Sequence, residues 1–164
     1  MSTPTINSSV SLTASIQSRI SNLIEANNEE SFNEAFDALY APTLSNISYN
    51  GAVISRDAYK QELGALYSIG TGSRASAAVT FQEVFEVVGG SDNSGDSIAI
   101  FFTVIINRKF LIRAAPAQTK VSTSLNAQVT NETGSDLGRI STVNHIALAA
   151  PVPVNLLPTL GSNA

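Results

Sequence analysis

The sequence predicts an α+β fold in which helices collect on one face of a curved antiparallel sheet. Apolar residues fall at helical spacing as far as Tyr67, and period-two alternation dominates after it. The predicted order is helix, helix, hairpin and helix, followed by four long strands. The pattern predicts one domain over residues 11–150, between a flexible N-terminus (1–10) and a proline-limited tail (151–164).

Three helices are predicted from the spacing of apolar residues and from residues typical of helix ends. The first covers residues 11–26, and the second ends at Pro42, since proline cannot continue a helix. Ser55 is a typical N-cap for the third helix, in which Tyr59 and Leu63 share one face.

Strands are predicted on both sides of the third helix. Asn50-Gly51 is the strongest two-residue hairpin signal, because both residues of that turn need positive φ. It separates predicted strands at 44–49 and 52–54. Four longer strands are predicted by alternation or by continuous apolar character, at 79–87, 98–107, 121–129 and 139–149.

Composition argues against several classes of function. The formal net charge is −4 and the basic residues are scattered, which argues against binding to nucleic acid. The chain has no cysteine and one histidine, so we expect neither a metal site nor a cofactor. No secretory signal and no apolar run of membrane-spanning length is visible, so we expect a cytoplasmic protein without membrane contact.

Residues 32–66, FNEAFDALYAPTLSNISYNGAVISRDAYKQELGAL, resemble the SnoaL-like polyketide cyclase group of the NTF2-like superfamily. In that group a helix ends in an aromatic-alanine step, a strand leads to a glycine turn, and a Ser/Gly-Arg-Asp-like cap begins the next helix. The resemblance covers about residues 11–150. It implies an NTF2-like cone, with three N-terminal helices packed on the curved antiparallel sheet. It also implies an open, mostly apolar cavity for a hydrophobic small molecule.

The resemblance also implies where a reactive group would lie. Ketosteroid isomerases of this superfamily carry a carboxylate base near the end of the first strand, and the matching position here is Ser48, which cannot abstract a carbon-bound proton. The candidates for proton transfer are His145, Tyr40, Tyr49 and Asp37, each of which has a purely structural alternative. The expected cavity lining is Phe36, Tyr59, Leu63, Phe102 and Asn144.

The orientation of the last strand decides the role of His145. Strict alternation puts Ile140, Asn144 and Ile146 on one face, with Val143 and His145 on the other. The first set is more apolar, so we expect it to face the helices, with Asn144 in the cavity and His145 outside. A β-bulge would reverse this assignment, because a slip of one residue exchanges the two faces.

Two interpretations of function stay open, so whether the protein is an enzyme is left undecided. The first is a small enzyme that isomerises, cyclises or dehydrates a hydrophobic metabolite by proton transfer. The second is a non-catalytic module that binds a small molecule or assembles as a homodimer. A third is a protein-interaction domain similar to nuclear transport factor, for which no residue marks a partner site.

A homodimer is expected from the strand at 98–107, IAIFFTVIIN, which is apolar on both faces. One face should meet the helices, and the other would be a large exposed apolar patch unless a partner covers it. The outer face of the sheet is therefore the expected interface.

Overall fold

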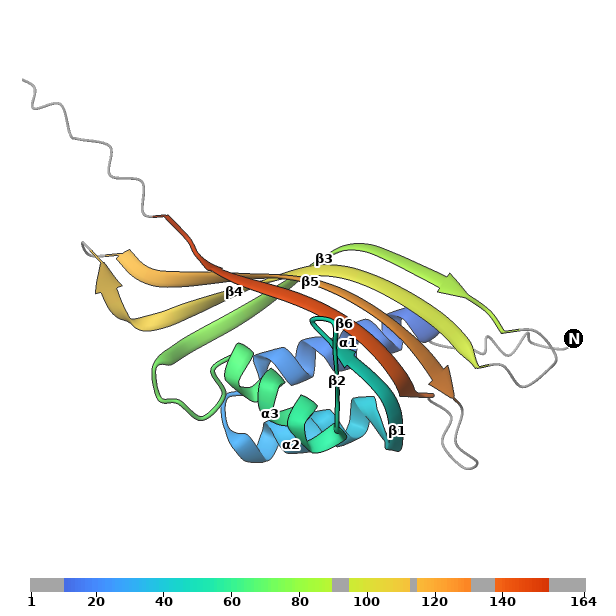
Figure 1. Cartoon of the computed structure of the whole chain (residues 1–164). Coiled ribbons are helices and arrows are strands. Elements are labelled where there is room, and N and C mark those ends of the chain that lie inside the picture. Colours follow the sequence, from blue (N-terminus) through green and yellow to red (C-terminus); the bar gives the residue numbers. More distant parts are fainter. Residues whose placement is uncertain (1–10, 90–94, 113–114, 131–137, 154–164) are drawn as a thin grey trace, which may run out of the picture.

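A computed structural model describes residues 11–89, 95–112, 115–130 and 138–153. Three helices lie on one face of a six-stranded sheet, which confirms the α+β class (Figure 1). The helices are α1 (Leu12–Glu25), α2 (Glu29–Leu39) and α3 (Arg56–Leu66). The strands are β1 (Tyr40–Tyr49), β2 (Ala52–Ile54), β3 (Arg74–Val87), β4 (Asp96–Ile112), β5 (Ala115–Thr130) and β6 (Arg139–Pro151). The predicted flexible N-terminus and positions 154–164 of the tail lie outside the described residues.

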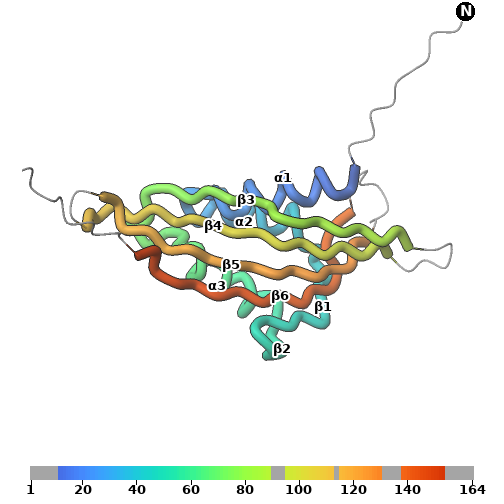
Figure 2. Tube along the Cα trace, turned by 90° about the horizontal axis from the view of Figure 1, so that it is seen from above, coloured from blue at the N-terminus to red at the C-terminus, as the bar shows by residue number. Residues whose placement is uncertain are grey.

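The sheet is mixed, with the strand order β2-β1-β6-β5-β4-β3. Neighbouring strands are antiparallel except β1 and β6, which pair in parallel, so the expectation of a wholly antiparallel sheet is wrong at this one pair. From above, the four long strands run side by side, with α1 along the β3 side and β1 with β2 at the opposite edge (Figure 2). None of the described helices has the length and apolar character needed to cross a membrane.

The helix ends follow local sequence chemistry. The hydroxyls of Ser11 and Ser55 each accept a hydrogen bond from a backbone N–H in the first turn of their helix, at 3.2 Å, as N-cap residues do. Helix α2 ends at Leu39, and the backbone is extended from Tyr40 onward, so Pro42 lies within β1. The prediction that this helix reaches Pro42 is therefore wrong by one turn, because the sheet recruits the residues before the proline.

The predicted hairpin turn is confirmed. Asn50 and Gly51 have φ values of 49° and 83°, the left-handed region that this turn requires. The Asn50 backbone N–H donates to the His145 carbonyl oxygen at 2.9 Å, and its side-chain oxygen accepts from the Ala147 N–H at 2.8 Å. The turn is therefore fastened to the middle of β6.

The long strands extend further than the sequence pattern predicts. Strand β4 continues to Ile112 and β5 begins at Ala115, where we expected only a connection. Alternation correctly assigns the inward residues of β4, which are Ile98, Ile100, Phe102, Val104 and Ile106. These side chains pack in one core cluster with apolar residues of all three helices.

A β-bulge in β3 changes which aromatic residues are buried. Phe81 pairs with Phe102 and packs against the core, and the next pair is Glu83 with Phe101, so Gln82 is an extra residue. After it the faces exchange, and Phe85 is 56% exposed on the outer face. In a regular strand Phe81 and Phe85 would share one face, and the bulge separates them.

Candidate functional site

Three polar side chains meet inside the fold, and we call Tyr40, Tyr59 and His145 the interior cluster. The two phenol oxygens are 3.1 Å apart, and the Tyr59 hydroxyl is 2.8 Å from His145 Nδ1. Each of the three residues is at most 1% exposed. They come from the start of β1, from α3 and from β6, so this chain of hydrogen bonds joins the helical layer to the sheet.

His145 faces the helices because β6 has a β-bulge at Ser141. Ile140 and Thr142 pair with successive residues of β5, so Ser141 between them is extra. Beyond it the alternation is displaced by one position, which exchanges the faces of the strand. The expectation that His145 lies outside and Asn144 lines the cavity is therefore wrong: His145 is buried and Asn144 is exposed.

Burial keeps the interior cluster neutral. Desolvation lowers the pKa of His145 to about 4 and raises the pKa of Tyr59 well above its ordinary value. Desolvation also raises the pKa of Tyr40, against a smaller lowering by its hydrogen bond with Tyr59. Near neutral pH the imidazole is therefore unprotonated and both phenols keep their protons. A neutral imidazole can accept a proton, but only from a group that reaches it.

The space beside His145 is too small for a metabolite. A void of about 10 Å³ adjoins Tyr40, Tyr67 and His145, with apolar side chains such as Leu63 and Phe102 around it. This is about the room of one water molecule, whereas sites for small molecules measure about 300–1,000 Å³. His145 Nε2 is buried and has no hydrogen-bond partner among the described residues. The open cavity that the family resemblance implies is filled by these side chains.

Tyr49 lies at the edge of the interior cluster. It is half-buried on β1, with its ring centroid 5.4 Å from that of His145 and 6.0 Å from that of Tyr59. Both contacts are edge-on, the favourable geometry for aromatic rings. Burial, with a smaller contribution from Glu62, raises the pKa of the Tyr49 phenol. Of the candidate catalytic residues, Tyr40, Tyr49 and His145 are thus brought together.

Asp37 is the candidate that the fold keeps apart. Its side chain is 57% exposed and accepts from Arg56 at 2.7 Å, with Lys60 Nζ 3.7 Å away. The hydrogen bond from Arg56 is the main reason that the pKa of Asp37 is lowered. Arg56 also donates to the Ala41 carbonyl, so it braces α3 against β1. Asp37 is therefore part of a surface ion pair and not of the interior cluster.

Four of the five predicted lining residues do converge. Phe36, Tyr59, Leu63 and Phe102 are all buried in the core cluster. Asn144 is the exception, and its side chain belongs to a hollow on the opposite face of the sheet. Within the described ranges, no three His, Cys, Asp or Glu side chains are close enough together to hold a metal ion.

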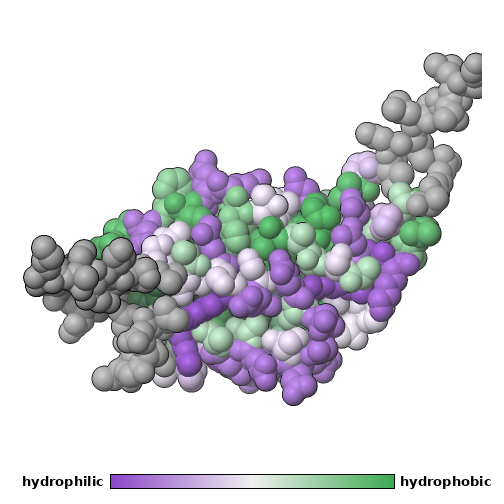
Figure 3. Space-filling model, turned by 180° about the vertical axis from the view of Figure 1, so that it is seen from behind, coloured by the Kyte–Doolittle hydropathy of each residue, from purple (hydrophilic) through white to green (hydrophobic). Residues whose placement is uncertain are grey.

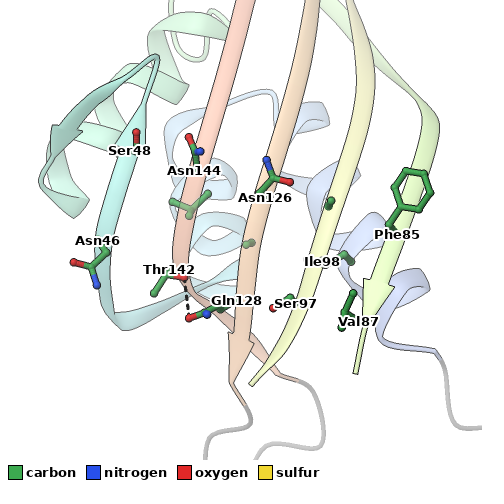
Figure 4. A pocket seen from close by; sticks show the side chains of 13 residues that line it. Asn46, Ser48, Phe85, Val87, Ser97, Ile98, Asn126, Gln128, Thr142 and Asn144 are labelled. Carbon is green, nitrogen blue, oxygen red and sulfur yellow. Dashed lines mark hydrogen bonds between the residues drawn. The ribbon is translucent and has the colours of Figure 1, made fainter. Parts of the chain in front are cut away.

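The hollow on the outer face, which we call the outer groove, has a volume of about 530 Å³. Two rows of directly paired residues cross it (Figure 4). The first row is Ser48, Asn144, Asn126, Ala99 and Phe85, in strand order β1, β6, β5, β4 and β3. The second row is Thr142, Gln128, Ser97 and Val87. Amides and hydroxyls of β1, β5 and β6 therefore lie on the floor of the groove together with apolar groups such as Ala99, and β3 supplies an apolar wall.

Asn46 adds a further amide at the β1 end of the outer groove. It is the extra residue of a bulge, since Ser45 and Ile47 pair with successive residues of β6, and its φ is 52°. Asparagine tolerates this left-handed backbone better than most residues do. The bulge places the Asn46 side chain at the groove, as Figure 4 shows.

The outer groove was not predicted from the sequence, and Asn144, which lies in it, was expected in the interior cavity. A usable signal was present, because Ser122, Ser124, Asn126 and Gln128 alternate along β5 with buried apolar residues. That alternation already identified a polar, uncharged stripe on the outer face. Its neighbours in the groove could not be identified, since they depend on the bulges in β1, β3 and β6.

Comparison with solved structures identifies the fold. No family model matches the chain, and no curated protein matches it. Nuclear transport factor 2 from Cryptosporidium parvum superimposes with a TM-score of 0.53 at 12% identity, over 85% of this chain and 92% of that one. A type 2 hexachlorocyclohexane dehydrochlorinase, LinA, superimposes with a TM-score of 0.53 at 7% identity, over 88% of this chain and 89% of that one. An NTF2-like protein of unknown function from Exiguobacterium superimposes with a TM-score of 0.50 at 14% identity, over 82% of this chain and 98% of that one.

At such identities these likenesses show the fold alone. They do not single out the SnoaL-like group, and they include both an enzyme and a transport factor. The chain has the NTF2-like α+β fold.

Proposed function

We propose that the protein is a non-catalytic binding module that uses the outer groove of its sheet and not the interior of its cone. The observation that carries the proposal is the difference in free volume between the interior beside His145 and the outer groove. The void beside His145 measures about 10 Å³, whereas the outer groove measures about 530 Å³, within the usual range for small-molecule sites. The neutral, buried interior cluster then has a structural role, tying α3 to β1 and β6.

This proposal is tested by mapping where small uncharged molecules bind. We expect NMR signals of β4, β5 and β6 around Asn126 and Asn144 to shift, while the His145 ring signals stay unchanged. Replacing both asparagines with alanine should abolish the shifts. Tyr59→Phe, which removes the central hydroxyl of the interior cluster, should preserve them. The opposite pattern, with His145 responding and Tyr59→Phe abolishing binding, would refute the proposal.

The second candidate is a proton-transfer enzyme, an isomerase, cyclase or dehydratase acting on a hydrophobic metabolite. The hydrogen-bonded chain from Tyr40 through Tyr59 to His145 favours it, because such a chain can relay a proton. It requires the interior to open by several hundred Å³ to admit a substrate. The SnoaL-like resemblance of residues 32–66 belongs to this candidate.

We also propose that the chain forms a homodimer through the outer face of the sheet. Ile146 and Leu148 on β6 are 56% and 70% exposed, and Ile146 shares a row with Ser124 and the partly exposed Phe101. The opposite side of the molecule, seen from behind with β3 and α1 in front, carries further apolar surface among hydrophilic side chains over the sheet half (Figure 3). The patch of Ile146 and Leu148 begins one row beyond Asn144, so the proposed interface borders the outer groove.

The dimer is checked by sedimentation equilibrium over a range of protein concentrations. We expect a mass of twice 17.2 kDa for the unmodified chain. Ile146→Lys should give the monomer mass, because a charge would be buried without a partner. Gln61→Lys on the exposed side of α3 adds the same charge and should leave the dimer intact. A monomeric unmodified chain, or equal effects of the two lysines, would contradict the proposed interface.

A further inference from the structure

We infer that the outer groove binds a neutral oligosaccharide. This rests on the proposed binding function of the groove and goes further by assigning the chemical class of the ligand. The observations that carry it are the unused hydrogen-bonding capacity of the floor, the absence of ionisable groups in the lining, and the apolar wall.

The floor of the groove offers amides that the protein itself leaves unpaired. The side chains of Asn46, Asn126 and Asn144 make no hydrogen bond to another described residue, whereas Gln128 accepts from Thr142 at 3.2 Å. Each asparagine amide carries two donors and an acceptor oxygen. Sugar hydroxyls are donors and acceptors at once, so one amide can hold two neighbouring hydroxyls.

The register sets these amides at a spacing suited to sugar rings. Asn126 and Asn144 are direct partners on adjacent strands, which lie about 4.8 Å apart. Ser48 continues the same row on β1. From β1 to β3 the row crosses five strands, a span of roughly 19 Å. The row is long enough for a short oligosaccharide rather than a single ring.

Among the residues that the structure describes, no Asp, Glu, Lys, Arg or His side chain lines the groove. A phosphate or carboxylate ligand needs positive partners, and an amine needs negative ones, so charged ligands gain nothing here. A neutral polyhydroxylated ligand needs only the amides and hydroxyls that the groove provides. Its binding should consequently be insensitive to salt.

The β3 wall provides the apolar complement. Phe85 and Val87 are 56% and 67% exposed at the end of the two rows. One face of a sugar ring is made of C–H groups, and an exposed aromatic ring is a platform for such a face. A bound peptide is less suited to this place, because peptides add to sheets at unpaired edges, and β4, β5 and β6 are each paired on both sides.

The test is an NMR titration of the ¹⁵N-labelled chain with four neutral tetrasaccharides: cellotetraose, laminaritetraose, maltotetraose and tetra-N-acetylchitotetraose. We expect at least one to shift the side-chain NH₂ signals of Asn126 and Asn144, with an affinity that salt does not change. The double variant Asn126→Ala with Asn144→Ala should bind at least about tenfold more weakly, since two or more hydrogen bonds are lost. Phe85→Ala should weaken binding, and Phe85→Tyr should restore it.

Ser122→Ala is the matched control, because this exposed β5 residue lies on the outer face beyond the groove. It should bind the tetrasaccharide as the unmodified chain does. If no tetrasaccharide shifts the groove signals but small uncharged carbonyl compounds do, the oligosaccharide assignment is wrong and the binding module stands. If neither the tetrasaccharides nor the carbonyl compounds shift the groove signals, the oligosaccharide assignment and the binding-module proposal are both wrong. Binding that survives the double asparagine variant also overturns the assignment.

Discussion

Replacing Phe36 with alanine should lower the free energy of unfolding by about 3–5 kcal/mol, the usual cost of removing a fully buried phenylalanine. The Phe36 side chain is 0% exposed, and its ring centroid lies 4.7 Å from that of Tyr40 and 6.3 Å from that of Tyr59. On its other side, the Arg56 guanidinium carbon and Lys60 Nζ lie 4.9 and 5.1 Å from the ring centroid. Alanine removes the apolar burial, the aromatic contacts and the cation–π contacts together.

The matched control for this prediction is Phe85→Ala, measured by the same urea denaturation. Phe85 is the same residue type but is 56% exposed on the outer face, so its loss should change the free energy of unfolding by about 1 kcal/mol or less. A small effect at Phe36 would mean that α2 does not pack on the sheet as described. Equal losses of unfolding free energy for Phe36→Ala and Phe85→Ala would also contradict the described packing of α2.

Acidification should destabilise the protein by about 3 kcal/mol through His145 alone. The unfolded chain binds a proton at this imidazole below pH 6.5, whereas burial lowers the pKa of the folded state to about 4. Stability from this group is therefore complete above pH 6.5 and is lost as the pH falls to about 4. The pKa difference of about 2.5 corresponds to about 3 kcal/mol.

The groups that face His145 do not add to the change in this pH range. Tyr40, Tyr49, Tyr59 and Tyr67 all have raised pKa values and stay protonated throughout. Asp37 belongs to a separate surface ion pair, and its lowered pKa places its titration below this range. The slope of stability between pH 4 and pH 6.5 should therefore report largely on the imidazole.

His145→Asn is the variant that isolates the effect, because an amide does not titrate and the asparagine Oδ1 lies near the position of Nδ1, where it can accept a hydrogen bond from the Tyr59 hydroxyl. Urea denaturation at pH 7 and pH 4 should show a difference between the two pH values that is smaller by about 3 kcal/mol than in the unmodified chain. An unchanged difference would show that His145 is not buried in its neutral form.

The layout of the fold could be predicted because its signals are local. Helical spacing, the N-cap residue Ser55 and the Asn50-Gly51 turn each act over a few residues and are confirmed. The inward set on β4 follows from simple alternation. The strand extensions at residues 108–112 and 115–120 were missed, because pairing between neighbouring strands overrides the weak local pattern there.

The orientation of functional residues depended on features that carry no local signal. Bulges at Asn46, Gln82 and Ser141 each insert one extra residue into a strand. Beyond the extra residue, side chains that regular alternation would place inside lie outside, and the reverse. Neither glycine nor proline marks any of them in the sequence. Consequently His145 was expected outside and is buried, whereas Asn144 was expected inside and lies in the outer groove.

The sequence also could not predict that side chains fill the interior between the helices and the sheet. The resemblance implied a cavity, and Phe36, Tyr59, Leu63 and Phe102 were expected to line it. They converge as expected, but together with Tyr67 and His145 they occupy the space themselves. Whether a cavity remains depends on how the volume of these side chains compares with the space that the curved sheet encloses. That space is a property of the assembled fold.

The most direct measurement is an NMR pH titration of the His145 ring, with and without a panel of apolar carbonyl compounds. His145 is the single histidine of the chain, so its signals are unambiguous. A closed interior gives a pKa of about 4 and no response to the compounds. A pKa near 6.5 that moves when a compound is added would mean that the cone is open to ligands. The proton-transfer enzyme would then replace the binding module as the function of this protein.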